Sequence, residues 1–211
     1  ENRRAEDKLI EAEGWSSIAH IMENQPYPEE FKKAWKGVLF NQFHDILAGT
    51  SIPSAYDDAS YLYGQAMAVG QEGLNYALQA ISWDVDIEED VTMRPIVGFN
   101  SHAWEGKMAV ELEVRGLSND SFKLTDHTGK VIPAQRIQSE ATVNGQSRLL
   151  FVADLPSMGY VLFKLYLNVE DAPNFTKIRA TDSELENDRF ILKFSEHTGY
   201  MESLYDKKAE L

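Results

Sequence analysis

The sequence predicts a multidomain α+β protein: a three-helix bundle, then a small antiparallel β-sandwich, then the first hairpin of a further β domain. Apolar residues recur every three or four positions up to about residue 83, which is the period of a helix. From residue 95 onward they recur every second position, which is the period of a half-buried strand. The predicted boundaries are 1–84 for the bundle, 85–167 for the sandwich, 168–183 for a polar linker, and 184–211 for the start of the further β domain.

Three apolar stripes at helical spacing predict the three helices. Residues 24–28 end the first helix, and the proline at the end of this stretch suits the first turn of the second. The second stripe reaches Ile46, so the second helix is predicted to continue through residues 38–47 and to end at Gly49. The third helix begins within residues 51–54. The stripes consist of Ala5, Leu9, Ala12, Trp15, Ala19 and Met22; of Phe31, Trp35, Val38, Leu39, Phe43 and Ile46; and of Ala55, Ala59, Leu62, Ala66, Val69, Gly73, Tyr76 and Ala80.

Short strands separated by turn signals predict the sandwich. In residues 107–115 large apolar side chains occupy every second position, and the positions between them are polar except at Ala109. Turn-forming residues recur at 118–120, 126–129, 144–145 and 156–159, as is typical of antiparallel sheets. Residues 185–194 and 200–205 then predict a hairpin. Because two strands alone are marginally stable in water, this hairpin must either cover the sandwich or begin another sheet.

Composition excludes several functions. The 211 residues include 20 Lys and Arg against 34 Asp and Glu, and the net charge of −14 argues against binding to nucleic acid or to anionic membranes. The chain has no cysteine, so any metal must be bound by His, Asp or Glu. No apolar run approaches the roughly 20 residues that a membrane-spanning helix needs. Neutral sugars and divalent cations remain compatible with the charge.

One of the five histidines stands out. His44 and its neighbours Asn41, Gln42 and Asp45 interrupt the apolar stretch 38–47, and burying four polar residues together is costly unless each is paired. From the residues alone, two interpretations stay open. The block is either a satisfied polar cluster at a helix end, or an imidazole and a carboxylate presented to another domain. In the second case the imidazole suits zinc and the carboxylate suits sugar hydroxyls. The other histidines, predicted to be without a functional role, are His20, His102, His127 and His197.

The stretch 41–52 reads NQFHDILAGTSI, and it closely resembles the middle-domain motif of the class II α-mannosidases of glycoside hydrolase family 38. The likeness is greatest to the bacterial and cytosolic branch, although Ala48 stands where that motif usually has proline. Residues 100–104 resemble the opening of the family's small β domain, and residues 185–187 and 203–207 resemble the entry to its large C-terminal β domain. The likeness covers nearly all of the chain, but only the motif around His44 is specific.

The resemblance implies a retaining, zinc-dependent hydrolysis of terminal α-linked mannose in glycans by two carboxyl groups. It implies that His44 is a ligand of one Zn²⁺ ion and that Asp45 contacts the mannose hydroxyls. In the family, the nucleophile and the remaining zinc ligands belong to an N-terminal α/β catalytic domain. We therefore expect no catalytic residue in this chain and no activity of this segment alone. The expected partners are a mannose-containing oligosaccharide and the N-terminal and C-terminal domains of the same longer chain, in the cytoplasm of a bacterium, with neither nucleic acid nor membrane.

Two other classes of function remain as alternatives. The chain could be a non-catalytic carbohydrate-binding or domain-packing module, which exposed flat aromatic side chains on the sandwich would favour. Most aromatic residues of that region fall at positions predicted to face the core: Phe99, Trp104, Phe122, Phe151 and Phe163. The chain could also be a stand-alone acidic helical adaptor. An exposed apolar patch around His44 would argue against the adaptor and for a site shared with another domain.

Overall fold

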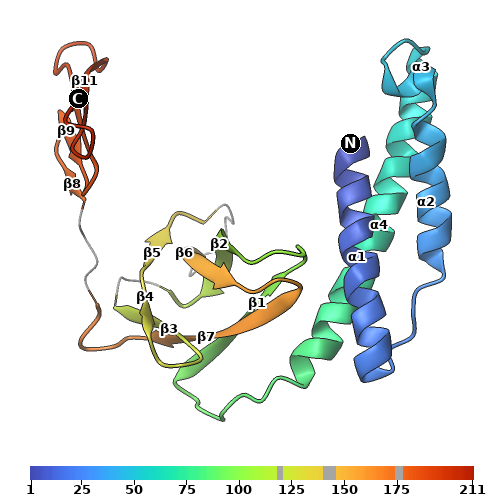
Figure 1. Cartoon of the computed structure of the whole chain (residues 1–211), viewed down its shortest axis with the longest axis horizontal. Coiled ribbons are helices and arrows are strands. Elements are labelled where there is room, and N and C mark those ends of the chain that lie inside the picture. Colours follow the sequence, from blue (N-terminus) through green and yellow to red (C-terminus); the bar gives the residue numbers. More distant parts are fainter. Residues whose placement is uncertain (118–120, 140–145, 174–177) are drawn as a thin grey trace. The chain divides into compact units, whose positions relative to one another are not determined.

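The structure is a computed structural model that describes residues 1–117, 121–139, 146–173 and 178–211. Its helices come first and its strands follow, so the predicted α+β class is confirmed (Figure 1). The chain divides into two compact units. The first comprises residues 1–110, 125–130 and 152–165, and the second comprises residues 111–124, 131–151 and 166–211.

Three long helices pack together in the first unit: α1 (Asn2–Glu23), α2 (Glu30–Asn41) and α4 (Pro53–Trp83), all visible in Figure 1. The stripe predicted for α1 is buried except at Met22, which is mostly exposed. The contact of α4 with its neighbours depends on small residues. A Cβ at Gly70 would lie 2.9 Å from the Lys8 side chain on α1, and a Cβ at Gly73 would lie against the Phe31 ring on α2. These glycines therefore allow close helix packing.

The prediction of three helices in residues 1–84 was wrong in one place, because a fourth, short helix α3 (His44–Leu47) stands between α2 and α4. The chain leaves the helical conformation at Phe43, which has φ −53° and ψ 138°. The Phe43 carbonyl then accepts hydrogen bonds from Ile46 N and Leu47 N, both at 3.0 Å, and these begin α3. The spacing of apolar residues does not reveal this break. Ile46 packs against the helical core in the structure, as the stripe of a continuous helix also predicted.

The stripe predicted for α4 is buried at Ala59, Ala66 and Gly73 and half-buried at Leu62 and Val69, but the prediction was wrong at Tyr76. Tyr76 is exposed, and the other buried positions are displaced by one residue from those predicted. An α-helix rotates its residues steadily relative to a seven-residue repeat. The most buried residues of α4 are therefore shifted by about one position from part of the predicted stripe, while Val69 of that stripe still packs against the core. The buried residues of α4 are Ala59, Tyr63, Ala66, Gly70, Gly73, Leu74, Ala77 and Ile81.

Residue contacts join the end of strand β1 (Met93–Asn100) to α1, within the first unit. Trp15 Nε1 donates a hydrogen bond of 3.0 Å to Ser101 Oγ, and the Ser101 hydroxyl donates one of 3.0 Å to Glu11 Oε1. The rings of Trp15 and Phe99 meet edge to face, with 5.1 Å between centroids. The preceding residues 86–90 form neither helix nor strand.

The region predicted as a sandwich consists of two sheets. One has the order β1-β7-β3-β4 and the other β2-β6-β5. Strand β2 alternates in burial as predicted, and β5 pairs antiparallel with β6, with Ala134 opposite Phe151. The turn at 126–129 is confirmed, with Gly129 at φ 87°, while the predicted turns at 118–120 and 144–145 lie outside the described residues. The strand bounds are β2 (Gly106–Arg115), β3 (Phe122–Asp126), β4 (Val131–Ile132), β5 (Ala134–Ile137), β6 (Gln146–Leu155) and β7 (Gly159–Leu167).

The last sheet has the order β11-β10-β9-β8. Its strands are β8 (Arg179–Ala180), β9 (Glu184–Glu186), β10 (Phe190–Phe194) and β11 (Met201–Asp206). The predicted hairpin is confirmed as β10 and β11, with Leu192 opposite Leu204. The prediction of one strand over 185–194 was wrong, because Asn187 Oδ1 accepts hydrogen bonds from Arg189 N and Phe190 N and turns the chain there. Part of the predicted linker also forms β8, so the hairpin belongs to a four-stranded sheet.

Candidate functional site at the end of the helical unit

The motif residues lie in α3 and in the loop that connects it to α4. Asn41 is the last residue of α2 and is completely buried, and its Nδ2 donates a hydrogen bond of 3.0 Å to the Ala59 carbonyl of α4. After α3 the chain turns at Gly49, where φ is 81°, a conformation that glycine adopts without strain. Asn41 thus anchors the start of the motif to α4.

His44 and Asp45 are side by side and both face outward. Their side chains are 78% and 51% exposed, and His44 Nε2 lies 3.4 Å from Asp45 Oδ1. The ring of His44 lies against that of Phe43, with 4.2 Å between centroids. Of the four polar residues in this block, Asn41 alone is buried and Gln42 is half-buried, so the interpretation of an imidazole and a carboxylate that project outward fits the structure better than that of a buried polar cluster. Because the helix breaks at Phe43, the imidazole and the carboxylate leave the core and incur no burial cost.

Hydrogen bonds from the loop and from α4 fix the backbone of Asp45. The Asp45 carbonyl lies 3.0 Å from Thr50 N and 3.3 Å from the Tyr56 hydroxyl. Thr50 Oγ1 lies 3.3 Å from both the Asp45 carbonyl and Asp45 Oδ1. Tyr56 Oη also accepts a hydrogen bond of 2.9 Å from Ser51 N. The carboxylate therefore projects from a loop that has a defined shape.

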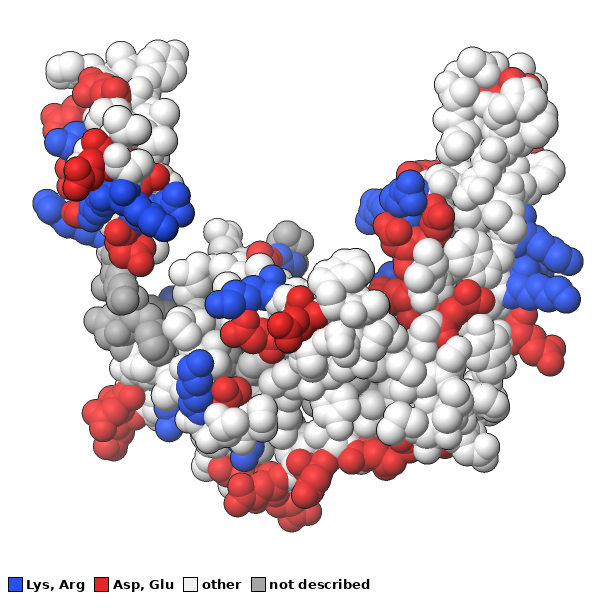
Figure 2. Space-filling model, viewed as in Figure 1, with Lys and Arg blue, Asp and Glu red and all other residues white. Residues whose placement is uncertain are grey.

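Exposed apolar side chains lie close to this pair in the chain. Four of them are each more than half exposed: Phe40, Phe43, Leu47 and Ile52. Figure 2 shows few charged side chains on the end of the helical unit where α3 lies. Exposed apolar side chains gathered around polar groups mark contact surfaces. An exposed apolar patch around His44 is expected of a site shared with another domain and not of a stand-alone adaptor.

The described residues can supply only part of a metal site. They contain no group of three or more His, Cys, Asp or Glu residues placed to hold an ion. Zinc needs three or four protein ligands, so His44 fits the role of a single ligand and no more. Its exposure leaves the imidazole accessible to an ion held mainly by other residues.

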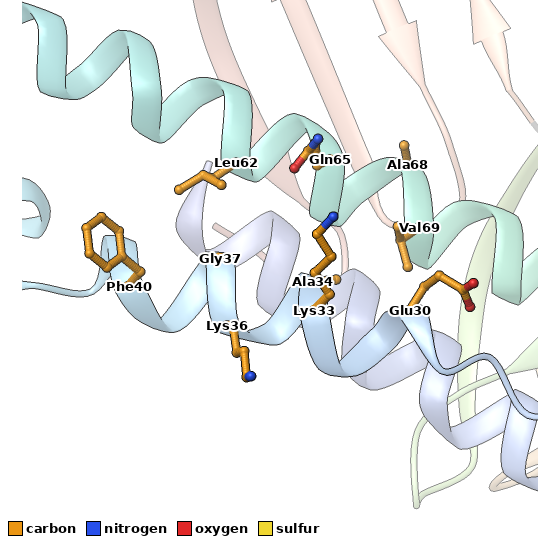
Figure 3. Close-up of a pocket in the computed structure, with 10 residues that line it drawn as sticks. All are labelled: Glu30, Lys33, Ala34, Lys36, Gly37, Phe40, Leu62, Gln65, Ala68 and Val69. Carbon is orange, nitrogen blue, oxygen red and sulfur yellow. The ribbon is translucent and has the colours of Figure 1, made fainter.

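A groove of about 550 Å³ runs between α2 and α4 beside the motif (Figure 3). Its apolar lining includes Gly37, Leu62 and Val69, with Lys33 and Glu30 among its polar residues. Phe40 lines the groove and directly precedes Asn41, the first residue of the motif, so the groove reaches the start of the motif. The groove holds no histidine and only one carboxylate, so it does not extend the chemistry of His44 and Asp45.

The remaining histidines lie outside the motif. His20 Nδ1 is 2.8 Å from the Gln25 carbonyl, at the end of α1.

Among the aromatic residues, one prediction was wrong. Trp104 was predicted to face the core but is 64% exposed and stacks on His102, with 4.7 Å between ring centroids. Three of the phenylalanines predicted to face the core are buried, namely Phe122, Phe151 and Phe163. Within the described helices, none is long and apolar enough to cross a bilayer.

This geometry defines a class of protein. It is an α+β chain whose helical unit presents an exposed histidine and an exposed carboxylate at one end. Residues 1–81 match the family described as alpha mannosidase middle domain. This match confirms the predicted resemblance of the helical segment to the middle domain of the glycoside hydrolase family 38 α-mannosidases. No curated protein matches the sequence.

Two solved structures from Enterococcus faecalis share the fold. A protein in glycosyl hydrolase family 38 has a TM-score of 0.68 at 19% identity, over 98% of this chain. An alpha-mannosidase from strain V583 has a TM-score of 0.67 at 17% identity, over 100% of this chain. The chain spans 28% of the length of each. At these identities the likeness shows the fold, and both relatives contain much more chain than the segment described here.

Proposed function

We propose that this chain is part of a longer, retaining, zinc-dependent α-mannosidase that removes terminal α-linked mannose from glycans. In this proposal His44 is one zinc ligand and Asp45 contacts mannose. The nucleophile and the remaining ligands come from an N-terminal α/β domain of the same protein, and a C-terminal β domain continues the chain. The observation that supports it most is the outward-facing pair of His44 and Asp45 at the end of a helical α-mannosidase middle domain. The cytoplasm of a bacterium stays the predicted location.

The two side chains suit these roles chemically. A neutral imidazole nitrogen is a common zinc ligand, and a carboxylate accepts strong hydrogen bonds from sugar hydroxyls. When bound, zinc supplies a Lewis acid that holds and polarises oxygen ligands. The exposed apolar side chains around the pair would be covered by the neighbouring domain, which would exclude water from the site. Asp45 would then hold the sugar in place through hydrogen bonds of its carboxylate.

The test uses the longer enzyme with His44→Ala, compared with His20→Ala as a control that removes an exposed histidine elsewhere in the same helical domain. We expect the first variant to lose bound zinc and aryl α-mannosidase activity and the control to keep both. Asp45→Asn should retain zinc and bind substrate more weakly. Unchanged metal content in the His44→Ala enzyme would remove this residue from the site.

The alternative of a non-catalytic carbohydrate-binding module has one observation in its favour, the exposed ring of Trp104. One face of that ring is already covered by His102, and the buried phenylalanines of the sheets provide no flat exposed surface. If the alternative holds, Trp104→Ala should abolish binding of mannose oligosaccharides to the 211-residue chain. We expect no such binding in either form.

A further inference from the structure

We propose that Thr50 and Tyr56 are positioning residues for Asp45, which hold its main chain and one carboxylate oxygen so that the other oxygen, Oδ2, is presented to the sugar. The inference rests on the proposed function, since it takes Asp45 as the mannose contact. It adds two residues that themselves touch neither sugar nor metal, and it assigns different roles to the two oxygens of the carboxylate.

The main-chain part of this arrangement depends on Tyr56, which lies in the second turn of α4. Its hydroxyl donates to the Asp45 carbonyl at 3.3 Å and accepts from Ser51 N at 2.9 Å. One side chain on a 31-residue helix thereby joins both sides of the loop that follows α3. The helix is the rigid part, and the loop takes its position from it.

The side-chain part depends on Thr50. Its hydroxyl lies 3.3 Å from both the Asp45 carbonyl and Asp45 Oδ1 but has one proton to donate. The carbonyl has two lone pairs, and these already accept from Thr50 N and the Tyr56 hydroxyl. The Thr50 proton therefore goes to Oδ1, where the bond to a charged acceptor is the stronger one.

These bonds leave the second carboxylate oxygen for a ligand. Oδ1 has Thr50 Oγ1 at 3.3 Å and His44 Nε2 at 3.4 Å as neighbours. Within the described ranges, no residue forms a hydrogen bond or ion pair with Oδ2, and half of the side chain is exposed. A carboxylate held by one oxygen has already lost part of its torsional freedom before the sugar arrives, so less freedom is lost on binding.

The geometry can be tested on the 211-residue chain itself. Tyr56→Phe removes the acceptor of the Ser51 amide, and we expect hydrogen exchange at that amide to become about tenfold faster, since a protecting hydrogen bond is lost. Tyr61→Phe is the matched control, because its hydroxyl accepts a hydrogen bond from Gln65 on the exposed side of the same helix. Equal exchange at Ser51 in the wild-type chain and in the Tyr56→Phe variant would overturn the proposal.

The functional consequence is tested in the longer enzyme with Thr50→Val, which keeps the shape of the side chain and removes the hydroxyl, and with Thr50→Ser, which keeps the hydroxyl. Residues that orient a binding group typically contribute 10–100-fold, so we expect Thr50→Val to raise KM for an aryl α-mannoside about tenfold. The kcat, the zinc content and the melting temperature should change little, and Thr50→Ser should restore KM.

Parallel measurement of His44→Ala separates the two proposals. If that variant keeps its zinc and its activity, the proposed function fails. If it loses both while Thr50→Val has the KM of the wild-type enzyme, the proposed function stands and the positioning role of Thr50 fails. The positioning role also fails if Thr50→Ser raises KM as much as Thr50→Val does, because the hydroxyl would then have no part in the effect.

Discussion

The side-chain amide of Asn41 donates a hydrogen bond of 3.0 Å to the main-chain carbonyl of Ala59, and this bond joins the last turn of α2 to α4. Asn41 is completely buried, whereas His44 and Asp45, three and four residues further on, face outward. The polar block of the motif thus divides into a structural residue and a pair available for binding. Both parts depend on the break at Phe43 that separates them.

Replacing Asn41 with alanine should lower the free energy of unfolding by about 1–3 kcal/mol, the range for a buried polar pair that loses one partner. Urea unfolding measures the change. Asn75→Ala is the control, because this residue accepts its hydrogen bond from Gln71 on the exposed face of α4. The control should change stability by about 0.5 kcal/mol or less. Equal losses in the two variants would mean that the bond to Ala59 contributes nothing of its own.

Two glycines of α4 should respond to alanine in opposite directions. A Cβ at Gly73 would clash with the Phe31 ring, which is itself buried, so Gly73→Ala should cost about 1–3 kcal/mol of unfolding free energy. Gly64 has open space around its Cβ position, and alanine there should stabilise the helix by up to about 1 kcal/mol. Melting temperatures of the two variants check this. A stabilising Gly73→Ala would show that α2 does not pack as closely as described.

The sequence predicted the elements whose pattern is local. The period of α1 and the alternation of β2 follow from neighbours in the chain, and the structure confirms both. It did not predict β8, because a two-residue strand is defined only by its pairing with β9. The exposure of Trp104 was also missed, since the alternation of a strand gives no information about the loop residues 101–105.

The candidate site was located by sequence but not explained by it. The motif identified His44 and Asp45, yet apolar spacing placed them inside one continuous helix and left open whether they face outward. Their outward position follows from the turn at Phe43, and the support of Asp45 follows from Tyr56, eleven residues away. Hydrogen bonds of this kind depend on the conformation of the loop at Gly49. Residue type and spacing alone do not determine that conformation.

The bond between Trp15 and Ser101 should show energetic coupling in a double-mutant cycle of Trp15→Phe and Ser101→Ala. A part-buried hydrogen bond typically contributes about 1 kcal/mol, and we expect a coupling energy of that size from urea unfolding. Ser17→Ala is the control, because Ser17 bonds only to the Glu13 carbonyl of its own helix. A coupling energy near zero would show that α1 and the end of β1 are not held together by this bond.

Lys207 should control the ionisation of Glu186 in the last sheet. The Lys207 ammonium donates a hydrogen bond of 2.6 Å to Glu186 Oε1, and this bond together with its charge holds the pKa of Glu186 below the ordinary value of 4.5. The stabilisation is therefore fully present above pH 4.5 and is lost as the pH falls through the lower pKa of the folded state. Lys207→Met should raise the pKa in an NMR titration, and the neighbouring Lys208→Met should raise it less. The same pKa in the Lys207→Met variant and in the wild-type chain would contradict the assignment.

The 211-residue chain by itself should fold but neither bind zinc tightly nor hydrolyse an aryl α-mannoside. Its described residues offer one exposed imidazole at the site and no group of three ligands, and a single ligand leaves most of the hydration shell of zinc in place. Circular dichroism checks folding, and metal content after gel filtration checks zinc binding. The chain with His44→Ala should behave identically in both measurements. Stoichiometric zinc that disappears in this variant, or measurable hydrolysis, would show that the segment holds a complete site and that no other domain is needed to supply its ligands or its nucleophile.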